Sequence, residues 1–383
     1  MDNIITYAES CLDTFEQKPF CDVDSLILSC LAYLDIPAQL AAGRTWRGLR
    51  LAELYRAEHF ERLFSVTFAP QKFRELLTVL AASPRFRDIR LMGYTATLDA
   101  VREKQFSAMT FRLAPKQSYI AFRGTDSTVV GWKENFNMSH MEAVPAQREA
   151  VEYVNEVLTR CRHKRVYIGG HSKGGNLAIY AAIHCAPEHR ERIMRIYNND
   201  GPGFRAEMVH SPAYRAMEDR IVTIIPQGSV VGRLLEHQDG YRVVKSTAQG
   251  LWQHNGFSWE VLGGEFVDAE ELTQESRLIE QSVKSWIADM SEEERENFVD
   301  ALYRVLTATN ATTLTELTAD RGWLWKLLRD GDPEARKTVF EGLAQLTGEA
   351  GRLWAESVLP ALRHGKMSAS RAGKAEKNED ENE

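Results

Sequence analysis

The stretch Arg165-Val-Tyr-Ile-Gly-Gly-His-Ser-Lys-Gly-Gly-Asn-Leu-Ala-Ile-Tyr180 decides how the rest of this chain is interpreted. Its apolar start predicts a buried strand, and its apolar end predicts a helix. Between them lies Gly170-x-Ser172-x-Gly174, the pattern of a sharp strand-to-helix turn that exposes a serine hydroxyl at a helix N-terminus. A plain glycine-rich turn is the alternative, but the flanking strand and helix are the context that the pattern requires. We therefore predict that Ser172 is a nucleophile.

Composition places the chain among ordinary globular proteins. Its 383 residues are 44% hydrophobic and 26% charged, enough to bury a large core and to add an accessory region. The formal net charge of -7 argues against a general nucleic-acid binder. No signal-peptide pattern and no apolar run of membrane-spanning length is found, so we expect a cytoplasmic protein without a transmembrane segment. Five cysteines without CxxC spacing imply neither a disulfide framework nor a zinc site, and we expect no metal or cofactor.

The pattern of apolar residues predicts an α/β fold over residues 1–264. Residues 1–60 and 70–82 have helical periodicity, and a helix is also expected before the serine turn, from 146 to 162. Strands alternating with helices favour a mainly parallel sheet covered on both faces, as in α/β hydrolases, with two antiparallel strands feeding it. The expected strands are residues 89–97, 105–113, 118–122, 166–169, 192–197, 220–226, 241–246 and 257–261.

Two further regions differ from this alternation. Residues 127–145 look irregular but carry apolar side chains, so the segment 127–142 either packs as core or covers a pocket as a lid. We expect Trp132, Met138 and Met141 from this segment to contact a substrate. From residue 265 to 364 only helices are expected, and they could bind a partner protein. The charged tail, 365–383, is expected to be disordered.

A serine nucleophile needs a base, and His254 is the best candidate. In this class of fold the histidine comes last in the order serine, acid, histidine, and His254 lies in a polar connection after most of the strands. Most other histidines come before the final strands. His171 is held in the serine turn itself, so we expect it to pack or to form hydrogen bonds.

The acid that orients the base is predicted by elimination. Asp200 follows the strand after the serine helix and lies between Ser172 and His254 in sequence. The next loop, around Ser229, contains no carboxylate. The alternative for Asp200 is a role in a helix cap or an Asx-turn, and Asp239 is the second candidate for the acid.

Two backbone amides are expected to stabilise an oxyanion: that of Lys173, directly after the serine, and that of Thr125, after an earlier strand. The Lys173 side chain is unusual, because a cation at a helix N-terminus opposes the helix dipole. We expect it to pair with Asp126 or Glu134, or else to meet an anionic headgroup of the substrate.

Four motifs in this order resemble the bacterial lipase class 3-like α/β-hydrolase family. They are Phe122-Arg-Gly-Thr125, Gly170-His-Ser-Lys-Gly-Gly175, Asn199-Asp-Gly-Pro-Gly203 and the late His254. The resemblance covers roughly residues 20–262 and implies the same roles for Ser172, His254 and the two amides. The chain departs from the family in three ways. Class 3 lipases usually carry the acid where this chain has Ser229, they have an apolar residue in place of Lys173, and they lack the C-terminal helices.

These observations predict a serine hydrolase that cleaves carboxylic esters, with lipid-like acyl esters as the expected substrates. Peptidase or acyltransferase chemistry would use the same residues. The alternative of a different class is a catalytically silent binding or scaffold protein that keeps the α/β-hydrolase fold and offers its C-terminal helices to a partner.

Overall fold

A computed structural model describes residues 2–41, 46–126, 128–161, 165–237, 240–307 and 332–344. The chain divides into two compact units, Met1–Glu280 and Gln281–Glu383, and the division lies within helix α12 (Gln274–Ala288). The first unit contains the sheet and all the residues that we predicted to be catalytic.

The first unit is built on a sheet of eight strands that are neighbours in chain order, from β1 to β8. Strands β1 to β4 are antiparallel, and every pairing from β4 to β8 is parallel. The α/β-hydrolase-like sheet is therefore confirmed. The strands are β1 (Leu49–Arg50), β2 (Arg90–Asp99), β3 (Lys104–Ala114), β4 (Gln117–Phe122), β5 (Arg165–His171), β6 (Ile193–Asn199), β7 (Ile221–Pro226) and β8 (Tyr241–Val244).

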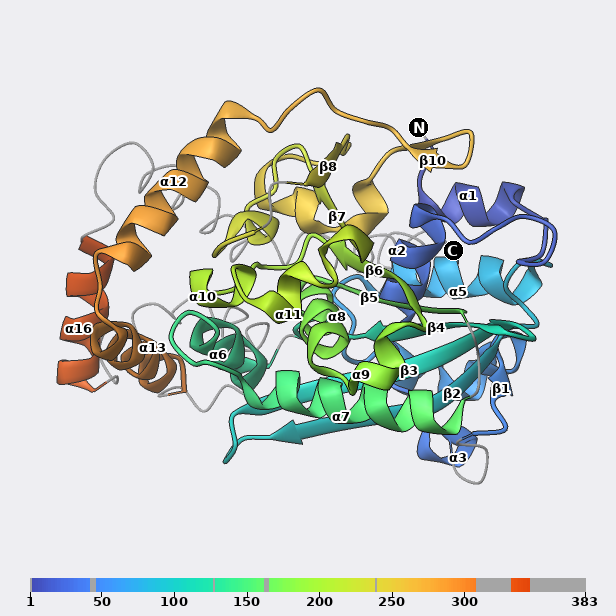
Figure 1. Ribbon diagram of the computed structural model, residues 1–383, viewed down its shortest axis with the longest axis horizontal. Helices are drawn as coiled ribbons and strands as arrows, with labels where there is room; N and C mark the ends of the chain where they lie inside the picture. Colours follow the sequence, from blue (N-terminus) through green and yellow to red (C-terminus); the bar gives the residue numbers. More distant parts are fainter. Residues whose placement is uncertain are drawn as a thin grey trace, which may run out of the picture. The chain divides into compact units, whose positions relative to one another are not determined.

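Helices cover both faces of this sheet (Figure 1). Strand β4 shows why, because its alternate side chains point to opposite sides. Tyr119 and Ala121 pack with the helices α1, α2 and α5. Ile120 and Phe122 pack with α7 and α8 on the other face. These five helices are α1 (Ile4–Ser10), α2 (Asp22–Leu31), α5 (Pro70–Ala82), α7 (Pro145–Arg160) and α8 (Lys173–His184).

The segment expected to be irregular contains a helix, α6 (Val129–Asn137). Thr128 begins it, and its hydroxyl accepts a hydrogen bond from the Gly131 amide at 3.1 Å. Two β-branched residues, a glycine and two asparagines lower the helix propensity here, so tertiary contacts must hold the helix. The prediction of an irregular segment was wrong for this part. Ser127 lies outside the described residues.

Of the strand expected at 257–261, Phe257 and Ser258 belong to a 3₁₀ turn and Trp259 forms an isolated bridge with Ser246. Val261 begins a separate two-stranded sheet of β9 (Val261–Leu262) and β10 (Glu265–Phe266). The remaining short helices are α3 (Ala38–Ala41), α4 (Phe60–Leu63), α9 (Pro187–Arg190), α10 (Ala206–Val209) and α11 (Pro212–Arg215). The 3₁₀ turns are η1 (Leu51–Leu54), η2 (Ala57–His59), η3 (Glu218–Arg220), η4 (Val231–Arg233), η5 (Gly250–His254) and η6 (Gly256–Ser258).

In the second unit the described residues are helical, as expected. Helix α13 (Glu292–Thr307) begins with a capping box, in which the Ser291 and Glu294 side chains each accept a hydrogen bond from the other residue's amide. Helix α16 (Pro333–Ala344) packs on α13. The helices expected at 313–329 and 349–362, and the tail 365–383, lie outside the described residues. No described helix is long and apolar enough to cross a membrane.

Candidate active site

The serine turn has the strained geometry that the sequence pattern predicts. Ser172 lies between the end of β5 and the start of α8, with φ of 59° and ψ of -135°. L-residues rarely adopt this conformation, so the surrounding structure must hold it. Part of the reason is close packing, since a methyl group on Gly170 would lie 2.2 Å from the Gly174 carbonyl carbon. Only glycines at these two positions let the strand and helix approach so closely.

Asp200 lies directly after β6 and is completely buried, with φ of 53°. One of its carboxylate oxygens, Oδ2, is 2.6 Å from Nδ1 of His254. The other, Oδ1, accepts a hydrogen bond from the Ser229 hydroxyl at 2.5 Å. An ionised carboxylate only accepts hydrogen bonds, so Nδ1 of His254 is the donor to Asp200, and in the neutral imidazole the lone pair is then on Nε2.

His254 ends η5 and lies beside the serine turn. Its ring centroid is 4.5 Å from that of His171, the residue before Ser172. The His254 side chain is 25% exposed, whereas Asp200 is fully buried, so the imidazole can meet a ligand from solvent. Among the described residues no hydrogen bond joins the Ser172 hydroxyl to this imidazole. Such bonds are often long before substrate binds.

The Asp200 loop also touches the serine directly. The Ser172 amide donates to the Asn199 carbonyl oxygen at 3.0 Å, and a methyl group on Gly201 would lie 2.3 Å from the Ser172 carbonyl oxygen. The structure thus brings Ser172, Asp200 and His254 to one edge of the sheet, where parallel strands β5 and β6 end. The second candidate acid, Asp239, lies outside the described residues.

The Lys173 side chain is fully buried and pairs with Glu134 of α6, at 2.9 Å between Nζ and Oε2. Its other two hydrogen bonds go to the backbone and side-chain oxygens of Gln105, each at 2.7 Å. Of the three alternatives for this cation, pairing with Glu134 is confirmed. Asp126 instead pairs with Arg123 at 3.1 Å. Lys173 has no donor left for a substrate headgroup, so that alternative was wrong.

The two residues predicted to be oxyanion donors, Lys173 and Thr125, both form side-chain hydrogen bonds with α6. Lys173 is the first residue of α8, so its amide has no acceptor within its own helix. Thr125 follows β4 and is partly exposed, and its hydroxyl accepts a hydrogen bond from the Asn135 side chain at 2.6 Å. Asn135 belongs to α6, so that helix holds the Thr125 loop. The role of the two amides as oxyanion donors stays a prediction.

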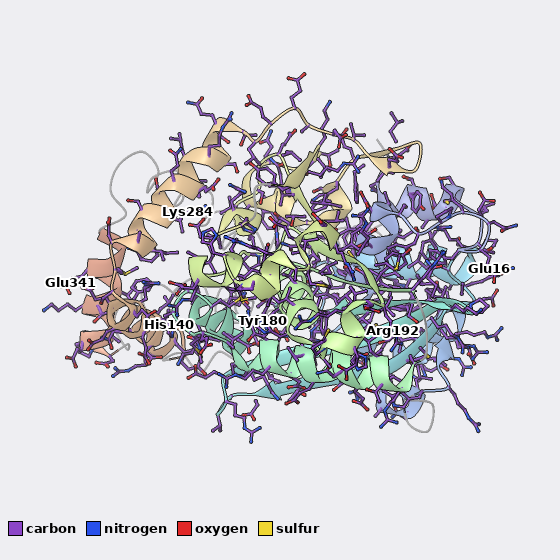
Figure 2. The ribbon with its side chains drawn as sticks, in the orientation of Figure 1. Glu16, His140, Tyr180, Arg192, Lys284 and Glu341 are labelled. Carbon is purple, nitrogen blue, oxygen red and sulfur yellow. The ribbon has the colours of Figure 1, made fainter. Side chains whose placement is uncertain are left out.

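The three residues predicted to contact a substrate differ in exposure. Trp132 of α6 is 39% exposed and Met141 is partly exposed, but Met138 is buried. The end of this segment is also held, because the His140 carbonyl oxygen, in a residue labelled in Figure 2, accepts a hydrogen bond from Arg205 at 2.7 Å. Only the exposed side chains are available to a ligand in this conformation.

Sequence reasoning missed two exposed aromatic residues near the site. Phe68 is 48% exposed, and its ring centroid is 6.2 Å from that of His171. Trp252 is 49% exposed and precedes His254 by two residues in η5. Phe68 had no local sequence signal, because it lies far from His171 in the chain, whereas the nearness of Trp252 to His254 in sequence was a signal that could have been used. Within the described part of the chain, no group of three or more His, Cys, Asp or Glu side chains could hold a metal ion.

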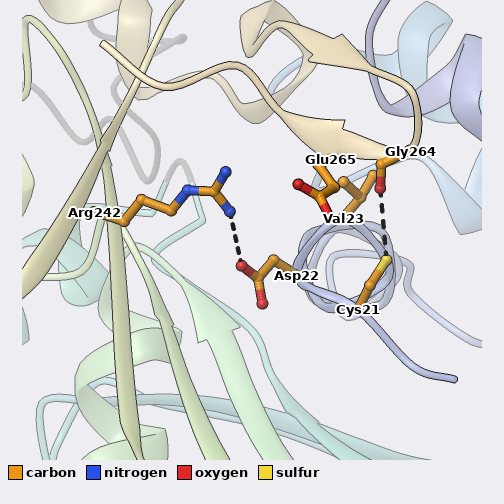
Figure 3. A pocket seen from close by; sticks show the side chains of 6 residues that line it. All are labelled: Cys21, Asp22, Val23, Arg242, Gly264 and Glu265. Atoms are coloured by element: carbon orange, nitrogen blue, oxygen red, sulfur yellow. Dashed lines mark hydrogen bonds and ion pairs between the residues drawn. The ribbon is translucent and has the colours of Figure 1, made fainter. Parts of the chain in front are cut away.

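A small pocket of about 180 Å³ lies elsewhere, at the start of α2 (Figure 3). Its Arg242 is already paired with Asp22 at 3.0 Å and with Asp268 at 2.5 Å. None of its lining residues belongs to the predicted site. The pocket is lined by Cys21, Asp22, Val23, Arg242, Gly264 and Glu265.

The sheet order, the serine turn and the pairing of the buried Asp200 with His254 define an α/β-hydrolase-like protein. Residues 80–304 match the model of the Mbeg1-like family, and the chain belongs to that family. This supports a lipase-like relationship, whereas the resemblance to bacterial class 3-like proteins in particular stays a prediction.

Similar solved structures include lipase II from Rhizopus niveus, at 16% identity and a TM-score of 0.31, covering 45% of this chain and 70% of that one. The native Rhizomucor miehei lipase propeptide complex is 14% identical with a TM-score of 0.35, covering 66% of this chain and 75% of that one. Likeness at this level carries no argument about function. Among curated proteins, none matches this chain.

Proposed function

We propose that this protein is a serine hydrolase that cleaves carboxylic esters, with lipid-like acyl esters as its substrates. The observation that carries the proposal is the pairing of Asp200 with His254 at 2.6 Å, beside a serine held at positive φ at the start of a helix. A buried acid, a partly exposed imidazole and a strained serine are the parts that acyl transfer needs.

The proposed reaction has two halves. Ser172 Oγ attacks the ester carbonyl carbon while His254 Nε2 takes its proton, and the buried Asp200 stabilises the resulting imidazolium. The amides of Lys173 and Thr125 donate to the oxyanion. The tetrahedral intermediate collapses, the alcohol leaves with the proton from His254, and an acyl-enzyme remains. Water activated by His254 then releases the acid.

Exposed aromatic side chains on the segments around the serine favour an apolar acyl group. Trp132 and Phe136 lie one turn apart on α6 and are 39% and 38% exposed. Phe68 and Trp252 add apolar surface beside His171 and His254. A contiguous exposed apolar patch, rather than a single exposed side chain, marks a binding surface, and the ring centroids of Trp132 and Phe136 lie 6.4 Å apart.

A lid role for residues 127–142 is compatible with this proposal only within limits. Moving α6 as a whole would separate Glu134 from Lys173 and leave two buried charges without partners. Any opening must therefore leave Glu134 in place. We propose that α6 serves mainly as a wall of the acyl site, with Trp132 facing the substrate.

The test is a series of p-nitrophenyl esters of increasing acyl length. We expect turnover by the wild type to rise from acetate to medium chains, and the Trp132→Ser variant to lose part of that rise. Leu262→Ser removes another exposed apolar side chain, 72% exposed, from the separate β9 and β10 sheet and should behave as wild type. Absence of turnover in a folded wild type would favour the scaffold alternative. Equal turnover at all lengths would contradict the lipid-like substrate.

A further inference from the structure

A tyrosine from the N-terminal region reaches the serine turn. Tyr33 follows helix α2 and is 2% exposed, and its hydroxyl lies 3.0 Å from Nδ1 of His171. The two residues are 138 positions apart in the chain. Tyr33 also lies before the residues that match the family model, 80–304. Any role for it at the site depends on a part of the chain that the match does not include.

The directions of the hydrogen bonds around His171 follow from its partners. Nε2 of His171 lies 2.7 Å from the backbone carbonyl oxygen of His254, which can only accept, so Nε2 must donate. Burial, and then the neighbouring His254, lower the pKa of His171 to about 3, so its ring is neutral at pH 7. A neutral ring with a proton on Nε2 has a lone pair on Nδ1. The Tyr33 hydroxyl therefore donates to Nδ1.

The hydrogen bond from His171 Nε2 supports the His254 peptide, because its carbonyl oxygen has no partner within its own turn. His254 is the last residue of η5, and carbonyl groups at the end of a helical turn receive no hydrogen bond from an N–H group of that turn. The same turn begins at Gly250, which has a φ of 53°. A methyl group on Gly250 would have no neighbouring atom within 4 Å. His171 thus holds the end of a turn whose beginning is open.

The Tyr33 hydroxyl touches a second part of the site. A methyl group on Gly124 would lie 2.0 Å from the Tyr33 oxygen and 3.0 Å from Ser172 Cβ. Burial raises the pKa of Tyr33, and a hydrogen bond from the Gly124 backbone opposes part of that rise. Gly124 precedes Thr125, the second predicted oxyanion donor. The Tyr33 hydroxyl therefore contacts both Gly124, next to the predicted oxyanion donor Thr125, and His171, which supports the His254 peptide.

We propose that Tyr33 and His171 are positioning residues that hold the His254 peptide and the 124–125 segment at fixed places relative to Ser172. They act through Tyr33 O–H to His171 Nδ1, and through His171 Nε2–H to the His254 carbonyl. Neither side chain exchanges a proton with the substrate. This inference rests on the proposed hydrolase function, because only a reaction at Ser172 gives the positioning a use.

The kinetic test compares Tyr33→Phe, His171→Gln and His171→Phe with wild type. We expect Tyr33→Phe to lower kcat roughly tenfold with KM unchanged, because misplacement of a catalytic group by about 1 Å is costly. The double variant Tyr33→Phe/His171→Phe should be no slower than His171→Phe alone, since both residues act in one series. His171→Gln, whose amide can replace Nε2–H, should recover part of the rate.

The matched control is Tyr153→Phe, which also removes a buried hydroxyl. Tyr153 belongs to α7, and its hydroxyl lies 2.9 Å from the Thr110 hydroxyl of β3. Tyr153→Phe should leave kcat unchanged. If Tyr33→Phe and Tyr153→Phe behave alike, or if the double variant shows the sum of both single effects, the positioning role is wrong.

A second measurement does not depend on turnover. The proton between His254 Nδ1 and Asp200 should give a downfield NMR signal, and we expect Tyr33→Phe to shift or broaden it while Tyr153→Phe does not. A shifted signal in a protein without esterase activity would support the positioning and end the hydrolase proposal. An unshifted signal in an active enzyme would end the positioning and leave the hydrolase proposal intact.

Discussion

Two pairs of ionisable side chains lie close to the serine turn, and they differ in burial and in unused hydrogen-bonding capacity. The pair of His254 with Asp200 is 2.6 Å long, and its histidine is 25% exposed. The pair of Lys173 with Glu134 is 2.9 Å long, and both of its side chains are fully buried. Each pair connects a residue at or near the serine to a distant part of the chain.

This difference in exposure and hydrogen bonding distinguishes a pair that can take part in the reaction from a pair that only stabilises the structure. His254 can reach solvent and keeps a lone pair on Nε2, so it can accept a proton from an incoming reaction. Lys173 gives all three of its hydrogen bonds to Glu134 and Gln105, so it can neither move nor bind a ligand. Charges close to a nucleophile are therefore not equivalent evidence for catalysis. Exposure and unused hydrogen-bonding capacity distinguish them.

Breaking the pair of His254 with Asp200 should have the largest effect on activity. We expect Asp200→Asn to lower kcat by about 10⁴-fold, because the amide favours the wrong tautomer of His254 while keeping the shape of the site. Steady-state kinetics on a p-nitrophenyl ester measures this, with circular dichroism to check the fold. Ser229→Ala, which removes only the second hydrogen bond to Asp200, should cost far less. A smaller loss for Asp200→Asn than for Ser229→Ala would contradict the assignment of the acid.

Breaking the buried pair should instead lower stability. Lys173→Met leaves the Glu134 carboxylate buried without its cation, and we expect the free energy of unfolding to fall by about 3–5 kcal/mol. Urea denaturation measures it. Lys173→Met/Glu134→Leu removes both charges and should recover much of the loss. Stability of Lys173→Met equal to that of wild type would show that this pair does not support the turn.

A third group beside the serine turn, the buried His171, is expected to make the stability of the protein depend on pH. Its pKa is about 3 when folded against 6.5 for the free side chain, so the unfolded chain binds a proton first as the pH falls. Stability should therefore decrease below pH 6.5, by about 2 kcal/mol between pH 7 and pH 5 from this residue alone. His171→Phe should lack that part of the slope in urea titrations. Identical slopes would mean that His171 is not buried in its neutral form.

Local patterns explain what could be predicted from the sequence. The serine turn depends on residues within one short stretch, so its strand, strained serine and helix could be expected from Gly170, Ser172 and Gly174. Chain order predicts Asp200 and His254 as the acid and the base, and the structure places their side chains in contact. At the position where class 3 lipases carry their acid, Ser229 donates a hydrogen bond to Asp200 instead.

Long-range contacts explain what could not be predicted. Helix α6 has weak intrinsic propensity, and contacts such as that of Glu134 with Lys173 hold it. The choice among three partners for Lys173 needed the fold, because Asp126 and Glu134 are both close in sequence to the same strand end. Tyr33 had no signal at all, since its partner His171 lies 138 residues away.

The reactivity of Ser172 is the most direct test of the central claim. A fluorophosphonate probe reacts with a serine only when a neighbouring base and oxyanion donors activate it. Intact-mass spectrometry of the folded full-length chain should show one adduct per molecule on the wild type and none on Ser172→Ala. No adduct on the folded wild type, or an adduct that persists in Ser172→Ala, would contradict the account.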